Sequence, residues 1–339
     1  MKFFITGGAG FIGSNCADYF LQQGHTVTIF DNLSRVGSQA NLEWLHEQHG
    51  SQRLMVIRGD VRDYPTLEEV IPGAEVVIHL ASQVAVTISV QDPREDFEVN
   101  ALGTFNMLEA VRHYCPEAPF IYSSTNKVYG GMEELCILEE DSRYIYADYA
   151  HGIAENYTLD FHSPYGCSKG SGDQYTRDYA RIYGLKTLTF RQSCIYGRRQ
   201  FGVEDQGWVA HFVIAAIMKR PINIYGDGKQ IRDLLHVSDL IRAYELGIKH
   251  IDHISGEVFN LGGGPENTLS IWAEFQPLLE SLAGRPIPIL RGSWRPGDQR
   301  VFVADIRKAS DLLEWQPTVS PAEGITDLFN WVSANRHLF

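Results

Sequence analysis

Short apolar runs alternate with amphipathic stretches over residues 1–125. Apolar runs without polar alternation are typical of strands that are buried on both faces of a parallel sheet. The longer stretches between them, such as residues 11–23 and 96–114, have the spacing of helices that pack by one face. The apolar runs occupy residues 2–6, 26–30, 54–57, 75–79, 119–122 and 185–190. This alternation predicts an α/β fold with a Rossmann-type, doubly wound parallel sheet.

The chain changes character after residue 192. Gly, Pro and aromatic residues become more frequent, and the helical stretches at 209–219 and 269–283 are separated by loops. Residues 237–249 and 258–261 again have the patterns of elements of the first sheet and its covering layer. We therefore expect a smaller, interleaved C-terminal lobe. The expected division is a larger domain of residues 1–192, to which 235–262 return, and a smaller lobe of 193–234 and 263–339.

Composition excludes several classes of partner. The formal net charge of −13 argues against nucleic-acid binding, because the phosphate backbone requires a basic face. No apolar run approaches the roughly 20 residues of a membrane span. Five cysteines are scattered without a Cys-x-x-Cys pair, which indicates reduced thiols and predicts neither a disulfide frame nor a metal site. Glycines interrupt the N-terminal segment before a signal-peptide core, so we expect a cytoplasmic protein.

Residues 6–13 give a Gly-x-x-Gly-x-x-Gly pattern directly after a strand and at the start of a helix. Gly7 permits a tight turn, Gly10 lets the backbone approach a pyrophosphate, and Gly13 allows the helix to pack closely on the strand. The first helical turn, with Phe11 and Ile12, presents N–H groups to the phosphates. The next strand ends in Asp31, about 20 residues further on, where a carboxylate binds ribose hydroxyls. NAD is therefore favoured over NADP.

Further cofactor contacts are expected where other strands of the sheet end. Arg35 lies close enough to Asp31 to leave NADP open. Asp60 and Val61 follow the third strand and are candidates for contact with adenine, although a helix cap explains Asp60 equally well. The segment 80–82 (Leu80, Ala81 and Ser82) follows the fourth strand and is expected to line the pyrophosphate and ribose.

Tyr165 and Lys169 lie four residues apart in a predicted helix over 164–183, and this spacing places them on one face. A phenol with a pKa of about 10 is a poor base at neutral pH. A neighbouring ammonium and an oxidised nicotinamide are both cationic and would lower the pKa of the phenol. Tyr-x-x-x-Lys also occurs by chance on surface helices. Here it accompanies a dinucleotide pattern and the hydroxyl-rich strand end at 123–125, which favours a catalytic role.

Taken together, these motifs identify the chain as similar to the extended short-chain dehydrogenases/reductases over nearly its whole length. The matching motifs are 6–13, 31–33, 100–103, 123–125, Tyr165-x-x-x-Lys169 and 295–298. The resemblance implies a nucleotide-activated sugar as substrate and tightly bound NAD. It also implies a catalytic triad of Thr125, Tyr165 and Lys169, and cofactor contacts from Asn32, Asn100 and Ser123.

Thr125 is followed by Asn126 and Lys127, and this pair bears on the reaction type. Sugar-nucleotide 4,6-dehydratases of the family carry Asp and Glu at these two positions, as the acid and base that eliminate water. Neither Asn nor Lys offers a carboxyl group, so the sequence disfavours dehydration. It favours an epimerase, which requires only transient oxidation of a sugar carbon and its reduction from the other face.

One subfamily resembles the chain more than the others. The segments 123–130, 159–169, 199–201, 205–208 and 298–305 are similar to those of CDP-paratose (CDP-tyvelose) 2-epimerases, which act at C2 through a 2-keto sugar. CDP-glucose is an alternative substrate, and a 4-epimerase or 4-reductase acting on a UDP- or GDP-sugar is an alternative activity. An alternative of another class is a non-catalytic NAD-binding regulator, which typically lacks the tyrosine and lysine that this chain retains.

The resemblance also assigns residues to the sugar-nucleotide pocket. Arg232 and Arg295 match arginines that bind phosphates, and Asp298 matches a residue that holds ribose; a surface ion pair is the alternative for each arginine. Phe201 and Trp208 serve equally well as core aromatics. The remaining candidates for substrate contact are Thr87, Ser89, Thr125, Asn126, Gln200 and Gln206.

In relatives, helices matching residues 96–114 and 164–183 pair two chains into a homodimer. In this sequence both stretches are long and amphipathic. The resemblance therefore implies a homodimer or a higher homo-oligomer.

Overall fold

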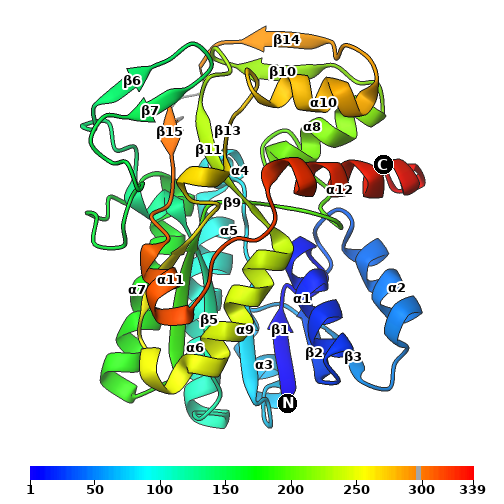
Figure 1. The fold of residues 1–339 in the computed structure, drawn as a ribbon. Coiled ribbons are helices and arrows are strands. Elements are labelled where there is room, and N and C mark those ends of the chain that lie inside the picture. The colour runs from blue at the N-terminus through cyan, green and yellow to red at the C-terminus, as the bar shows by residue number, and fades with distance from the viewer. Residues whose placement is uncertain (295–298) are drawn as a thin grey trace.

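Seven parallel strands form the sheet at the centre of the larger lobe (Figure 1). The computed structural model describes residues 1–294 and 299–339. The strand order is β12-β8-β5-β4-β1-β2-β3, so the direction of winding reverses between β1 and β4. The strands are β1 (Lys2–Thr6), β2 (Thr26–Asp31), β3 (Leu54–Arg58), β4 (Val76–His79), β5 (Phe120–Thr125), β8 (Thr187–Gln192) and β12 (Val258–Leu261). The predicted doubly wound α/β fold is confirmed.

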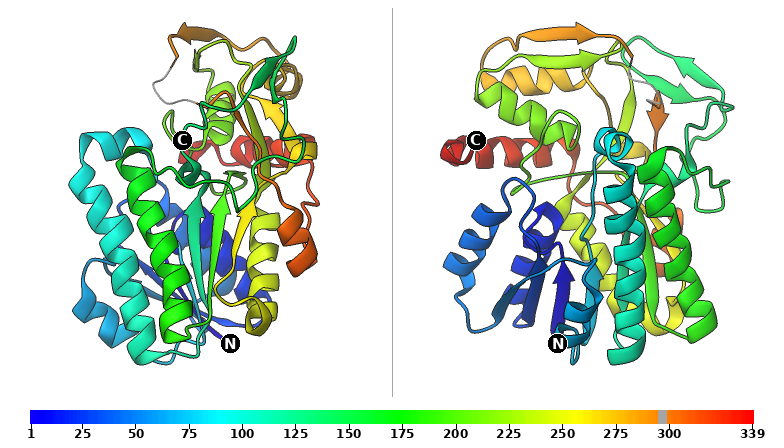
Figure 2. Two further views of the ribbon diagram at one scale, coloured as in Figure 1. Left: turned by 90° about the vertical axis from the view of Figure 1, so that its left-hand side faces the viewer. Right: turned by 180° about the vertical axis from the view of Figure 1, so that it is seen from behind.

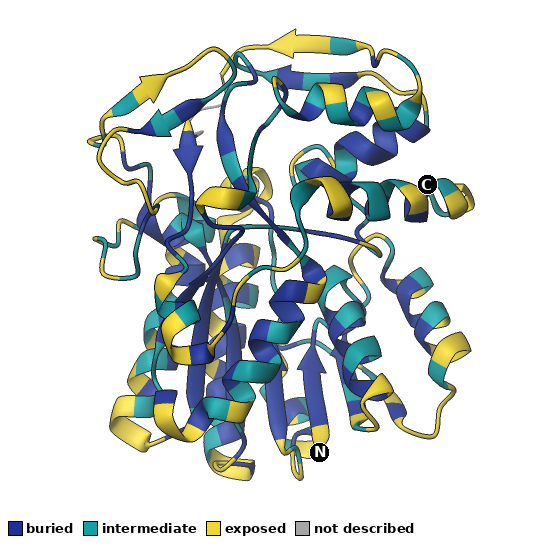
Figure 3. Cartoon of the chain, viewed as in Figure 1, coloured by how far each residue is buried: buried dark blue, intermediate teal, exposed yellow. Residues whose placement is uncertain are grey.

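Helices cover both faces of this sheet, which explains why its strands are apolar throughout. Successive residues of a strand point to opposite faces, so Phe3 and Ile5 pack into one core and Phe4 into the other. Figure 3 shows the buried strands inside a shell of helices with exposed outer faces. The first face is covered by α1 (Phe11–Gln22), α2 (Ser38–His49), α9 (Val237–Ile254) and α11 (Arg307–Leu313). The second is covered by α3 (Tyr64–Val70), α6 (Gly103–Tyr114) and α7 (Ser163–Tyr183).

A smaller lobe lies over the carboxyl ends of the strands (Figure 2). Its core is formed largely by α8 (Trp208–Ile217), α10 (Phe275–Ala283) and α12 (Pro321–Ala334). Its strands are β6 (Ile137–Glu139), β7 (Tyr144–Tyr146), β9 (Cys194–Tyr196), β10 (Ile222–Tyr225), β11 (Ile231–His236), β13 (Thr268–Ser270), β14 (Ile289–Gly292) and β15 (Val301–Phe302). The lobe boundaries given above stay a prediction.

The two lobes are joined closely. Only Ser193 separates β8 of the large sheet from β9, which pairs with β11 of the smaller lobe. The backbone N–H of Ser193 donates to the carbonyl oxygen of Leu261 at 2.9 Å, and its hydroxyl donates to Asp233. Asp233 is fully buried and also accepts from the backbone N–H of Ala304 at 3.1 Å. The joint is therefore hydrogen-bonded to strands of both lobes.

Short helices connect these elements. They are α4 (Val86–Gln91), α5 (Pro93–Phe97), the π-helical turn η1 (Glu98–Leu102), and the 3₁₀ turns η2 (Asn126–Tyr129), η3 (Pro265–Asn267) and η4 (Arg336–Leu338). Within the described residues, no helix combines the length and apolarity that a membrane span requires. The same residues contain no group of three or more His, Cys, Asp and Glu side chains that could hold a metal ion.

Two predicted helices differ from the observed ones. The predicted helix over 96–114 is divided by η1, in which Asn100 lies; π-turns within helices often mark functional positions. The predicted helix over 269–283 begins only at Phe275, because Leu269 pairs with Arg232 in the ladder between β13 and β11. There, strand pairing outweighs the helical spacing of the apolar residues.

The close approach of α1 to β1 gives a prediction for Gly13. A Cβ atom at this position would lie 2.2 Å from the carbonyl oxygen of Gly7 and 2.6 Å from the Cα of Gly8. Backbone atoms cannot move away as a flexible side chain can, so we expect Gly13→Ala to lower the free energy of unfolding by about 1–3 kcal/mol. Urea denaturation measures this loss.

Gly131→Ala is the matched control, because the nearest neighbour of a Cβ there is the flexible Glu133 side chain, at 3.3 Å. Equal stability of the two variants would contradict the tight helix–strand contact.

Candidate active site

The candidate residues lie at the carboxyl edge of the sheet, near β1 and β4. The chain adds further strands in opposite directions on either side of this pair. Open α/β sheets form a crevice at such a point, because the loops after the two strands diverge. Thr6, His79 and Thr125 are the last residues of β1, β4 and β5. The first two are hydrogen-bonded, with the Thr6 hydroxyl 2.7 Å from Nδ1 of His79. The loops that follow these strands build the site.

The glycine-rich loop after β1 packs closely against the loop after β4 and leads into α1. Gly7 has a φ of +66°, and a Cβ on it would lie 2.7 Å from the backbone nitrogen of Ala81. Gly10 precedes α1 in an extended conformation, and no side chain caps the helix there. Phe11 and Ile12 form the first turn. The backbone N–H groups of this turn are thus available to the phosphates of a dinucleotide.

Asp31 at the end of β2 ties the next strand to this loop. One carboxylate oxygen accepts the backbone N–H of Ala9 at 3.0 Å, and the other accepts that of Leu33 at 2.8 Å. Burial raises the pKa of Asp31, and the two backbone hydrogen bonds lower it. The carboxylate thus lies beside the glycine-rich loop, where a ribose hydroxyl group is expected.

Neighbouring polar residues mostly satisfy one another. Asn32 donates to Asp60 at 3.0 Å, and Arg62 donates to the same carboxylate at 2.8 Å. These hydrogen bonds from Arg62 lower the pKa of Asp60 to about 2. Asp63 is the N-cap of α3. The alternative interpretation of Asp60 as a helix cap is therefore wrong. The Arg35 guanidinium donates to Gln206 Oε1 at 2.6 Å and so links the cofactor side to the smaller lobe.

The loop after β4 meets the π-turn. Ser82 donates to the Asn100 side chain at 2.7 Å, and Asn100 donates to Asp96 at 2.9 Å. The backbone N–H groups of Leu80 and Ala81 both donate to the Thr6 hydroxyl at 3.2 Å. Val61 is buried against Gly103, and Ser123 is hydrogen-bonded to Tyr244. Hydrogen bonds and packing therefore hold these cofactor candidates at the carboxyl edge of the sheet.

Thr125 lies beside Tyr165 and lowers the pKa of its phenol, and the Thr125 hydroxyl donates to Asn126 Oδ1 at 3.4 Å. The backbone N–H of Tyr165 donates to the Ser89 hydroxyl at 3.2 Å, so Ser89 fixes the first turn of α7. Burial raises the pKa of Tyr165 to about 12, with a further increase from Asp96, and the Thr125 hydrogen bond opposes them.

Lys169 lies one turn further along α7 and is buried. Its Nζ atom is 4.4 Å from the ring centroid of Tyr122. Burial lowers the pKa of Lys169 to about 7, while the charges of Asp96 and Asp173 raise it. Desolvation dominates the pKa of both side chains in the chain alone, so the lowering of the phenol pKa by Lys169 and an oxidised nicotinamide together stays a prediction. Phenolate formation thus requires further positive charge beside the ring.

The other candidates for substrate contact are more dispersed. Asn126 follows Thr125 directly, and Arg232 lies on β11 with Nη1 2.8 Å from the carbonyl oxygen of Ile231. Thr87 is exposed on α4. Gln200 is buried and donates to the carbonyl oxygen of Ile195 at 3.2 Å.

The two aromatic candidates lie among core side chains. Phe201 packs against Phe339, with ring centroids 5.1 Å apart. Trp208 packs against Phe275 at 5.3 Å and donates to Cys194 Sγ at 2.8 Å. Arg295 and Asp298 lie outside the described residues.

Sequence reasoning missed the charged residues beneath the catalytic candidates. Asp96, Asp173 and Arg191 are almost completely buried around Lys169 or the end of β5. Asp173 follows Lys169 by four residues, so a carboxylate on the buried face of an amphipathic helix was a visible signal. Lys127, which the sequence did single out, has its Nζ atom 3.0 Å from Gln299 Oε1 and donates to it.

Comparison with known proteins places the chain in a family. Residues 4–328 match the family described as GDP-mannose 4,6 dehydratase. A CDP-paratose 2-epimerase from Salmonella typhi is 44% identical over 341 residues, which cover 98% of this chain and 100% of that protein.

Two solved structures are also similar. A dTDP-glucose 4,6-dehydratase from Streptomyces venezuelae, with NAD and TYD bound, has a TM-score of 0.85 at 26% identity and covers 100% of this chain and 99% of its own. A UDP-glucuronic acid 4-epimerase from Bacillus cereus, with UDP-glucuronic acid and NAD, has a TM-score of 0.84 at 28% identity and covers both chains completely. The chain therefore belongs to the GDP-mannose 4,6-dehydratase family of extended short-chain dehydrogenases/reductases.

Proposed function

We propose that the chain is an NAD-dependent epimerase that inverts C2 of a CDP-activated dideoxyhexose of the paratose/tyvelose type. The observation that carries this proposal is the placement of Thr125 beside Tyr165, next to a turn that begins with Asn126 and Lys127. The pair provides a group for proton transfer, and the turn lacks the carboxyl groups of a dehydratase. The 44% identity to a CDP-paratose 2-epimerase supports the choice of substrate.

The residues at the carboxyl ends of β1, β2 and β4 are of the types that bind a dinucleotide. The N–H groups at the start of α1 suit a pyrophosphate, and Gly7 and Gly10 keep the backbone free of side chains there. Asp31 would bind the adenosine ribose, and the loop at Ala81 and Ser82 would line the other half of the cofactor. Bound NAD supplies the reversible oxidation of one sugar carbon.

The chain's own residues handle the proton. The Tyr165 oxygen takes a proton from the sugar hydroxyl group and later returns it. Thr125 donates a hydrogen bond to that oxygen and so favours the ionised phenol. Lys169 adds positive charge from beneath, and Asp96 and Asp173 help it to retain its proton.

The turn after Thr125 disfavours elimination of water. Removal of a proton from C5 and loss of the C6 oxygen require a base and an acid near those atoms. Asn126 cannot ionise, and the Lys127 ammonium is hydrogen-bonded to Gln299. A sugar oxidised at this site is therefore reduced again and not dehydrated.

Product analysis tests the function. The purified protein is incubated in D₂O with a panel of CDP-, UDP- and GDP-hexoses, and C2, C4 and C5 of the products are examined by NMR. We expect inversion at C2 alone, without deuterium, because the original hydrogen returns to the same carbon. Inversion at C4 would show a 4-epimerase instead. Net oxidation of reduced cofactor would indicate a reductase, and deuterium at C5 would indicate a dehydratase.

Tyr165→Phe removes only the oxygen that transfers the proton. We expect this variant to keep its stability and to lose about 10²–10⁴-fold in turnover. Tyr175→Phe is the matched control, since Tyr175 is an exposed tyrosine on the same helix. Activity of Tyr165→Phe above a tenth of that of the wild type would remove Tyr165 from the mechanism.

We also propose that two chains pair through α6 and α7, which lie side by side in the right-hand view of Figure 2. Large apolar side chains are exposed along them and the neighbouring turns, which favours an interface. These side chains are Val90, Phe97, Leu102, Phe105, Tyr175, Ile182 and Tyr183.

Light scattering at micromolar concentration is expected to give the mass of a dimer. Phe105→Glu should give monomers, because it places a charge on this face, whereas Leu138→Glu changes an exposed apolar residue of β6 and should leave the dimer intact. A monomeric wild-type protein would refute the pairing.

A further inference from the structure

Asp173 occupies the same face of α7 as Tyr165 and Lys169, because the three residues follow one another at intervals of four. Its side chain is completely buried. A buried carboxylate is costly unless hydrogen bonds and an opposite charge compensate it. The hydrogen-bond partners of Asp173 therefore indicate which parts of the structure its carboxylate fixes in place.

Gln174 on α7 itself donates to the carboxylate at 2.8 Å, and the other partners lie on two adjacent strands. Arg191 on β8 binds the carboxylate with two nitrogens, at 2.9 and 3.0 Å, and the Ser124 hydroxyl on β5 donates to it at 2.8 Å. Ser124 and Arg191 are direct neighbours in the parallel ladder between these strands. One carboxylate thus fixes the ends of two strands against the helix.

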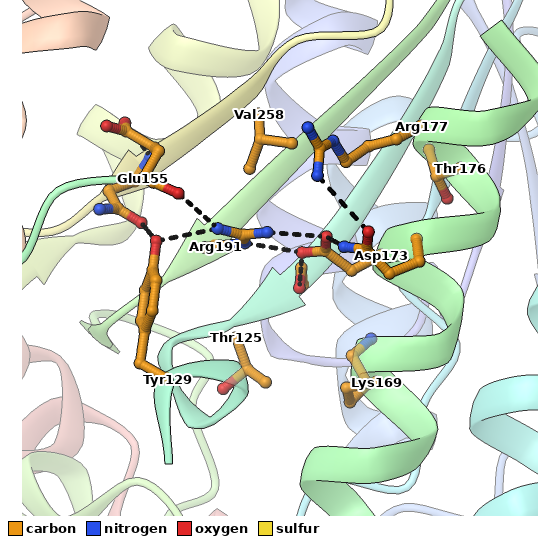
Figure 4. A network of polar contacts seen from close by, with 12 residues as sticks. Thr125, Tyr129, Glu155, Lys169, Asp173, Thr176, Arg177, Arg191 and Val258 are labelled. Atoms are coloured by element: carbon orange, nitrogen blue, oxygen red, sulfur yellow. Dashed lines mark hydrogen bonds and ion pairs between the residues drawn. The ribbon is translucent and has the colours of Figure 1, made fainter. Parts of the chain in front are cut away.

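Arg191 extends the network to the other side of Thr125, as Figure 4 shows. Its Nη1 atom donates to the Tyr129 hydroxyl at 3.1 Å and to the carbonyl oxygen of Glu155 at 3.2 Å. Tyr129 is the last residue of η2, the turn that starts directly after Thr125. Thr125 therefore stands between two anchored residues, Ser124 and Tyr129.

We propose that Asp173 is a positioning residue for the reaction, and that through Ser124 and Arg191 it holds the Thr125 hydroxyl in register with Tyr165 and Lys169. Asp173 is not a catalytic residue, since its carboxylate is fully occupied by these partners on the buried side of the helix. The inference rests on the proposed function, because it assumes that these three side chains perform the chemistry.

Asp173 also contributes charge at Lys169. The titratable groups around Lys169 are Asp96 at the end of α5, Asp173 and Tyr165 on α7, His79 on β4 and Tyr122 on β5. Asp96 and Asp173 raise the pKa of Lys169 against burial. Loss of the Asp173 charge would lower the pKa of Lys169, so its ammonium form would be lost at a lower pH.

Two variants separate positioning from stability. Ser124→Ala removes one hydrogen bond and leaves the ion pair intact, and Asp173→Asn removes the charge with little change of shape. Tyr179→Phe is the matched control, since it removes a 2.7 Å hydrogen bond to Glu109 from the far end of the same helix. The wild type and each variant are assayed as holoenzymes for kcat, KM and the pH dependence of kcat.

We expect kcat to fall about 10-fold in Ser124→Ala and on the order of 10²-fold in Asp173→Asn, as for a catalytic group that is displaced slightly. KM should change little, because substrate binding is untouched. In Asp173→Asn the alkaline limit of kcat should move to lower pH, and in Ser124→Ala it should not. A merely structural role would reduce the folded fraction and leave kcat per folded molecule and its pH limit unchanged.

Unchanged kcat in Ser124→Ala and Asp173→Asn, or an equal loss in Tyr179→Phe, would overturn the inference. If Asp173→Asn does not fold because Arg191 is left unpaired, Ser124→Ala alone decides, and a wild-type kcat for it refutes the role. Failure of the wild type to convert any nucleotide sugar would instead overturn the proposed function, and the inference would fall with it.

Discussion

Parallel pairing of the seven strands is the constraint on which the rest of the structure depends. A parallel sheet needs a crossover after every strand, and the crossover helices cover both of its faces. Side chains along the strands are therefore enclosed, and polar groups can reach a ligand only where the strands end. Because all strands run in one direction, those ends lie at one edge. The glycine-rich loop, Asp31 and Thr125 are consequently close together although they are far apart in the sequence.

Burial at this edge sets the protonation of the central groups. It raises the pKa of Tyr165 and lowers that of Lys169, so the protein alone favours a neutral phenol and weakens the ammonium. The carboxylates of Asp96 and Asp173 compensate for burial at Lys169, whereas Asp96 raises the pKa of Tyr165 further. The Tyr165 phenol therefore stays protonated until more positive charge is brought beside its ring. Such an arrangement couples proton transfer to the presence of a cationic partner.

Much of this arrangement was predictable from the sequence, because local patterns determine it. The strands of the large sheet were expected within one to a few residues at each end, since their apolar runs are short and are followed by Gly, Asp, Ser or Thr. The helix that carries Tyr165 and Lys169 was also expected, because proline, helical periodicity and a following glycine mark its ends. Gly7, Gly10 and Gly13 were recognisable because a tight turn and a close helix–strand contact admit no side chain.

What the sequence did not reveal depends on partners distant in the chain. Asn100 in the π-turn accepts a hydrogen bond from Ser82 in the loop after β4. Leu269 belongs to a strand because it pairs with β11. Burial raises the pKa of Tyr165 and lowers that of Lys169. The spacing of residues in the sequence does not show how deeply a side chain is buried. Asp173 was overlooked because its partners Ser124 and Arg191 lie on strands that only the fold makes adjacent. The roles assigned to the individual site residues stay predictions.

The joint at Ser193 has a consequence for how a substrate is admitted. Proteins that close around their ligands usually turn one lobe about a short, loosely bonded hinge. Here one residue links strands of two sheets, and its hydrogen bonds to Leu261 and Asp233 engage both. Rotation at this place would break them together with the pairing of β9 and β11. Rotation of the lobes at Ser193 is therefore costly, so the movement that lets a ligand enter and leave is expected in the surrounding loops and not at this joint.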